Sequence, residues 1–158
     1  MNKIHIGAIL GLCALALAAQ AQGQGRKPGL WEVTSSMSMA GMPQMAQMGS
    51  HTTQVCVTQA MIDKYGGPTS NPQTGNCHMT NVQLTASGMT ANMSCSGQMN
   101  MTGTVQTTFI DANTTKTTLT MTMASGNGQT MNMTTQATAA YKGADCGSVK
   151  PITMPASQ

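Results

Sequence analysis

Alternating apolar and polar residues dominate the second half of the chain. Four runs there, rich in Thr, Val and Met, place an apolar side chain at every second position, and short sequences of Gly, Ser, Asn or Asp separate them. A period of two is typical of strands with one buried face, and such turns join neighbouring strands into antiparallel hairpins. The pattern therefore predicts a β-meander, with strands over residues 89–95, 99–109, 115–125 and 129–141.

The turns also predict how these strands pair. Directly opposed residues of an antiparallel pair point to the same side of the sheet. Turns centred on Gly97, Ala112 and Asn127 keep the odd-numbered face continuous across all four strands. That face carries the Met residues, and the even-numbered face carries Thr, Asn and Gln. We expect a Met-lined inner side and a wet outer side, with one inner row that reads Met93, Met101, Met123, Met131.

The first half of the chain is less regular. Leu30–Met39 and His51–Val57 have the composition of strands, and residues 58–65 predict a short helix whose first residue, a threonine, is the N-cap. A further strand covers residues 77–86. Its apolar positions change from odd to even, which requires a bulge, and we place this bulge near His78. Together these elements predict an all-β fold with minor α content, an antiparallel meander curled into a half-barrel or small barrel.

The first 21 residues have the features of a secretory signal peptide. Lys3 supplies the positive charge, Ile6–Ala19 is apolar but shorter than a membrane span of about 20 residues, and small residues precede a cleavage site before Gln22. Removal of residues 1–21 leaves a single β-rich domain over residues 22–158, without a transmembrane segment. We therefore expect the protein to be periplasmic or secreted.

Four cysteines remain in that domain. An even number of cysteines in an exported chain indicates disulfides, which form in an oxidising compartment. The spacing of the cysteines to each other and to the histidines fits no zinc site. Four cysteines allow three pairings. The expected sheet favours one of them, because the strand that begins at Cys77 starts at the Gly97 end, where Cys95 lies. The predicted bridges are Cys77–Cys95 and Cys56–Cys146.

Charge is scarce and scattered along the chain. Charged residues are 7% and aromatic residues 3% of the sequence, and the formal net charge of +3 comes from isolated side chains. No basic stripe exists that would neutralise a row of phosphates, which excludes an electrostatic nucleic-acid binder. Acid–base catalysis needs titratable groups gathered in one place, and no catalytic motif is present. We expect a non-enzymatic protein and keep an unrecognised hydrolase as an alternative.

Methionine is the one abundant side chain with distinctive chemistry, at 17 of 158 residues. Thioethers are soft ligands that select Cu(I) or Ag(I) over hard cations. In the loop after the first strand they recur every two or three residues, so three of them can surround one ion. The alternatives are that Met fills an irregular core, or that it is oxidised reversibly as a scavenger. The candidate metal ligands are Met37, Met39, Met42, Met45, Met48 and His51.

Several short sequences resemble a family of small exported bacterial proteins of unknown function. They are Lys27–Glu32 (KPGLWE), Cys56–Thr58 (CVT), Asp145–Gly147 (DCG) and Val149–Pro151 (VKP), and the resemblance covers residues 26–151. It implies a Gram-negative envelope setting, and it implies no reaction, cofactor or catalytic residue. The sequence as a whole favours a periplasmic binding or envelope-associated protein of unknown partner. If this protein has a ligand, a small apolar molecule against the Met-lined face is one candidate. Soft-metal binding is the alternative.

Overall fold

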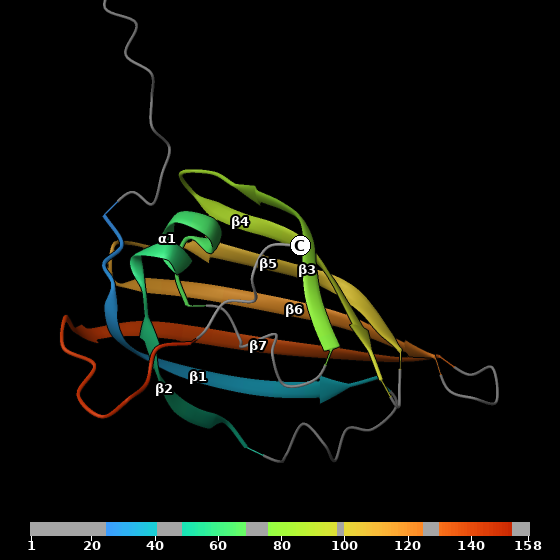
Figure 1. The fold of residues 1–158 in the computed structure, drawn as a ribbon. Coiled ribbons are helices and arrows are strands. Elements are labelled where there is room, and N and C mark those ends of the chain that lie inside the picture. The colour runs from blue at the N-terminus through green and yellow to red at the C-terminus, as the bar shows by residue number, and fades with distance from the viewer. Residues whose placement is uncertain (1–24, 41–48, 69–75, 98–99, 125–129, 153–158) are drawn as a thin grey trace, which may run out of the picture.

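The protein is a seven-stranded antiparallel sheet with one short helix (Figure 1). This computed structural model describes residues 25–40, 49–68, 76–97, 100–124 and 130–152. The helix α1 spans Gln59–Tyr65 and lies between the second and third strands in the chain. The strands are β1 (Gly29–Met39), β2 (His51–Val57), β3 (Asn76–Leu84), β4 (Gly88–Ser96), β5 (Met101–Phe109), β6 (Thr114–Ala124) and β7 (Thr130–Gly143).

The order of the strands in the sheet is β2-β1-β7-β6-β5-β4-β3. Strands β3 to β7 form the predicted meander, and β1 extends it by pairing with β7. The edge strands β2 and β3 do not pair with each other, so the sheet is an open half-barrel and not a closed barrel. In Figure 1 the sheet curls from β2 to β3, and α1 lies against it near one end of the strands. Within the described ranges, no helix is long and apolar enough to cross a membrane.

The predicted register is confirmed for two of the three hairpins. Met101 faces Met123, and Met123 faces Met131, as the turn positions indicate. The predicted pairing of β4 with β5 is wrong by two residues, because the observed pairing is centred one residue beyond Gly97: Met93 faces Gly103, and Cys95 faces Met101. A shift of two residues leaves every side chain on its predicted face.

Gly103 explains why the observed register packs well. It lies in one row between Met93 of β4 and Met121 of β6, both of which are buried. A Cβ atom at Gly103 would come within 2.7 Å of the Met121 sulfur and within 2.0 Å of the Thr120 carbonyl oxygen. The glycine therefore supplies the space that two long thioether side chains need on either side of it.

The predicted bulge in β3 exists, but it lies further along the strand than His78. The register against β4 shifts between Thr80 and Gln83, and Asn81 has a φ of 52°. Asparagine tolerates this left-handed conformation better than most residues. The bulge moves the inward positions from odd to even numbers. As a result, four side chains of β3 pack against the core: Cys77, Met79, Val82 and Leu84.

The core has two parts, and α1 contributes side chains to both. One part lies under β3, β4 and β5 and contains Tyr65 of the helix together with buried Met and Ala side chains. The other surrounds Trp31, which is 0% exposed and packs with Met61 and Ile62 of the helix. The helix itself begins and ends as expected: the Thr58 hydroxyl accepts a hydrogen bond from the Met61 N–H (3.3 Å), and a left-handed glycine follows its last turn.

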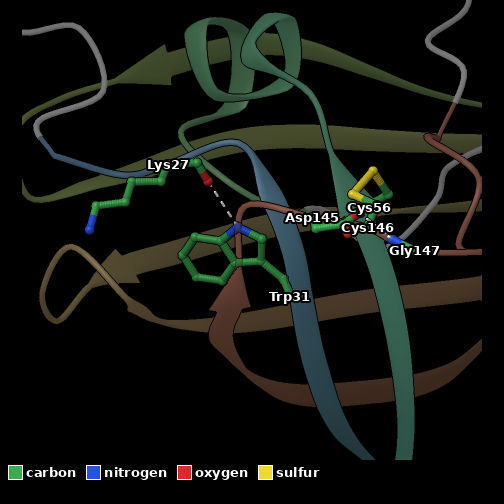
Figure 2. The surroundings of a disulfide bond; sticks show 6 residues. All are labelled: Lys27, Trp31, Cys56, Asp145, Cys146 and Gly147. Atoms are coloured by element: carbon green, nitrogen blue, oxygen red, sulfur yellow. Dashed lines mark hydrogen bonds between the residues drawn. A yellow bond between two sulfur atoms is a disulfide. The ribbon is translucent and has the colours of Figure 1, made fainter.

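Both predicted disulfides are present. Cys77 and Cys95 face each other across β3 and β4, 18 residues apart. Cys56 of β2 binds Cys146, 90 residues later, and holds the segment after β7 alongside β2, where Cys56 also forms a parallel bridge with Pro151. Figure 2 shows this bond near Trp31, whose indole N–H donates a hydrogen bond to the Lys27 carbonyl oxygen (3.1 Å). The segment before β1 and the segment after β7 thereby lie at the same part of the core.

The two disulfides differ in the length of chain they close, and we expect their stabilities to differ accordingly. The loop-entropy relation gives about 4.6 kcal/mol for Cys56–Cys146 and about 3.2 kcal/mol for Cys77–Cys95 at 25 °C, from separations of 90 and 18 residues. Urea unfolding followed by circular dichroism should therefore show a larger loss for the C56A/C146A variant than for C77A/C95A. A larger loss of stability for C77A/C95A than for C56A/C146A would contradict the loop-entropy explanation.

Candidate functional site

The predicted metal ligands that the structure describes lie at one end of the sheet and on its inner face. Met37 and Met39 are near the end of β1, and His51 is the first residue of β2. His51 faces Ser35 of β1, and Met39 faces Met133 of β7, so these side chains share the odd-numbered side with Trp31 and the core. Met42, Met45 and Met48 lie outside the described residues. The structure thus brings together the two ends of the predicted loop.

Methionines of β7 continue this group of thioethers. Met133 faces both Met39 and the buried Met121, while Met131 faces the buried Met123. The side chain of Met37 is 47% exposed, and three neighbours on the same face are half-buried. We call these four residues of β1 and β7 the thioether patch: Met37, Met39, Met131 and Met133.

The chemistry of the thioether patch is that of soft, neutral sulfur. All four described cysteines are in disulfides, so no thiolate is present there. The described residues contain no group of three His, Cys, Asp or Glu side chains that would hold a metal ion. A thioether is polarisable and flexible, so the patch offers two options: it can adapt to an apolar molecule or coordinate a soft monovalent cation.

A second candidate site lies at the opposite end of the inner face, around Arg26, the only arginine of the chain. Arg26 precedes β1 and is 6% exposed. Its guanidinium carbon lies 3.4 Å from the centre of the Phe109 ring, at the end of β5. Thr115 faces Phe109 across β5 and β6 and is 1% exposed. Arg26 does not stand out in the sequence, because a lone arginine before a strand belongs to no motif.

No acidic side chain neutralises Arg26, although all four acids of the chain are described. Glu32 pairs with Lys142 at 2.7 Å, and Asp63 accepts a hydrogen bond from Gln59. The other two are Asp111 and Asp145, which accept hydrogen bonds from backbone N–H groups of their own turns.

Within the part of the chain that the structure describes, three buried polar atoms around Arg26 have no hydrogen-bond partner. They are Nε and Nη2 of Arg26 and the hydroxyl oxygen of Thr115. Burial lowers the pKa of Arg26, because removal from water disfavours its charged form. Stacking on an aromatic ring returns about 2 kcal/mol when the cation is desolvated. Burying a charge costs several kcal/mol, and unpaired donors add to that cost. The stacking contact alone therefore does not offset the burial.

The outer face of the sheet carries shallow polar grooves. One of about 320 Å³ follows β1, β7 and β6 and is lined mainly by Ser and Thr hydroxyls, Gln136 and Lys116. Another, of about 680 Å³, lies beside the bulge at Asn81 and is lined largely by Thr, Asn and Gln. Residues of the thioether patch line neither groove, and this matches the predicted separation of a wet outer face from a Met-lined inner face.

The fold and these sites define a class of protein: a small, disulfide-bonded β half-barrel whose inner face is lined by thioethers. The chain belongs to a family described as a protein of unknown function, DUF3617, whose family model matches residues 26–146. The predicted resemblance to a family of unknown function is confirmed at this level. No curated protein and no solved structure shows a significant match to the chain.

Proposed function

We propose that this protein is exported to the envelope of a Gram-negative bacterium and binds a small apolar ligand at the thioether patch, without catalysing a reaction. The observation that carries this proposal is the exposure of Met37, 47%, on the face of the sheet that elsewhere carries the buried core. Exposed apolar side chains gathered on a concave face are typical of a binding surface.

The surroundings of the patch support an apolar ligand. Leu119 and Val33 are half-buried on the same face of the sheet. Thr135 of β7 faces Met37 on one side and Leu119 on the other, so these three residues form one row across the sheet. No charged residue lies in that row. Thioether side chains repack easily around ligands of different shape, so the patch needs no preformed cavity.

The proposal of a non-enzymatic role rests on how the acids are placed. Each of the four carboxylates is exposed or half-buried and is engaged in an ion pair or a local hydrogen bond. His51 lies at the patch and His78 on β3, and both are exposed. General acid–base chemistry requires such groups to converge on one reacting atom.

Export is tested at the cleavage site. When the full chain is expressed in a Gram-negative host, we expect periplasmic protein that begins at Gln22, because Ala19 and Ala21 provide the small residues that the signal peptidase requires. N-terminal sequencing of each cell fraction measures this. The A21L variant should stay uncleaved, whereas A18L, which changes a residue inside the apolar stretch, should be processed. Uncleaved wild-type protein in the cytoplasm would contradict the proposal.

Ligand binding is tested with the neutral fluorescent probe N-phenyl-1-naphthylamine. We expect saturable binding, which the M37Q/M39Q variant weakens about tenfold because it replaces two contacting thioethers with amides. The control is I110Q, which removes the other large exposed apolar side chain of the described residues, at 53% exposure and outside the patch. Unsaturable binding, or equal weakening by I110Q, would exclude the patch as the site.

A second candidate function is the binding of Cu(I) or Ag(I). The placement of Met37, Met39 and His51 at one end of the inner face favours it, because both ends of the predicted Met loop meet there. Thioether and imidazole ligands suit a soft monovalent ion.

Titration with Cu(I) against a competing chelator distinguishes this function from the binding of an apolar ligand. Replacement of Met42, Met45 and Met48 by Leu keeps the apolar surface and removes the sulfur. We expect one ion per chain, held at about micromolar affinity or tighter, and about tenfold weaker binding in this variant. Binding of the naphthylamine probe should not change, and M89L serves as a control in the buried core. Unchanged Cu(I) affinity in the triple variant would discard the metal function.

A further inference from the structure

We propose that Arg26 and Thr115 form an oxyanion site that binds a carboxylate or phosphate group. The site lies at the end of the inner face opposite the thioether patch, next to α1. It is separate from the proposed apolar site and does not depend on it. The inference starts from the only arginine of the chain, which is buried without an acidic partner.

The geometry of the guanidinium indicates which atoms face a ligand. A guanidinium carbon 3.4 Å from a ring centre lies flat over the ring, so its N–H bonds point sideways and not at Phe109. The unpartnered atoms Nε and Nη2 share one edge of the guanidinium. Their N–H bonds run nearly parallel and match the two oxygens of a carboxylate or phosphate. The edge that lacks partners is thus the edge that recognises oxyanions.

Thr115 adds a third donor to the same region. Its hydroxyl oxygen is buried and unpartnered, and the residue faces Phe109 across the β5–β6 pair. Gly67 adjoins both side chains: a Cβ atom there would lie 3.7 Å from Thr115 Cγ2 and 3.9 Å from Arg26 Cδ. Gly67 therefore lies beside both side chains and contributes no side chain of its own there.

Charge favours an anion over a water molecule at this edge. A water molecule can accept hydrogen bonds from the N–H groups, but it leaves the positive charge of Arg26 uncompensated. Each of the four acids of the chain is engaged elsewhere. An oxyanion satisfies both the donors and the charge. A carboxylate or phosphate group can belong to a free small anion or to the acidic head group of an amphiphile. The experiment distinguishes these two ligands.

The test is calorimetric titration of the purified exported protein with inorganic phosphate and with acetate. We expect R26Q to weaken binding about tenfold or more, and R26K to weaken it about fivefold, since lysine keeps the charge and loses the paired donors. K27Q removes the same charge one residue away and should change the affinity by no more than about twofold. No binding of either anion to the wild-type protein at about 10 mM, or equal weakening by K27Q, would overturn the site.

T115V keeps the test valid if the Arg26 variants fail to fold. The hydroxyl has no partner in the free protein, so T115V should melt no lower than the wild type. It should nevertheless lose about threefold or more in phosphate affinity. If no Arg26 variant folds, a stable T115V protein with unchanged phosphate affinity would by itself overturn the proposal.

Decanoate and decanol identify the source of the anion. If decanoate binds about tenfold more tightly than acetate and decanol does not bind, the ligand is the head group of an amphiphile. Equal affinities for decanoate and acetate support a free small anion. Binding of N-phenyl-1-naphthylamine at the thioether patch should be the same in R26Q, so failure of the anion site and failure of the apolar site give different results.

Discussion

The packing of methionine and small apolar side chains on one face of the sheet is the interaction on which the rest of the structure depends. The chain has few aromatic residues, and a single tryptophan anchors one part of the core. Flexible thioethers fill the irregular space that larger rings would otherwise occupy. Gly103 shows how closely this packing is balanced, because it makes room for Met93 and Met121 in one row. The two disulfides stabilise a domain whose core is poor in bulky side chains.

The inner face of the sheet has two chemically different ends. At one end, α1 and the segment before β1 cover the core and bury Arg26 over Phe109. At the other end, β1 and β7 present the thioether patch, where Met37 is partly exposed. An apolar or soft ligand suits the second end, and an oxyanion suits the first. The outer face carries mainly hydroxyl and amide side chains and few charged ones, such as Lys116.

Much of this fold could be predicted from the sequence because the side-chain period of a strand is two. The inner positions of β4 to β7 followed from alternation alone, and an error of two residues in the β4–β5 register did not move Met93 or Met101 to the other face. Turn length is a weaker signal than alternation, and for this reason the predicted β4–β5 register was wrong. The bulge in β3 was predicted near His78, but it lies at Asn81. Arg26 could not be predicted as a site, because its burial depends on Phe109 and Thr115, far away in the sequence.

Brief oxidation by hydrogen peroxide, followed by peptide mass spectrometry, tests the central claim most directly. It measures how fast each methionine of the folded protein becomes a sulfoxide, which depends on access of the oxidant to sulfur. If thioethers line the hidden side of the half-barrel, Met37 reacts fast, while Met89, Met121 and Met123, exposed by 1%, 2% and 6%, stay protected until the protein unfolds. Equal rates at Met37 and at those three residues in the native protein would contradict the account.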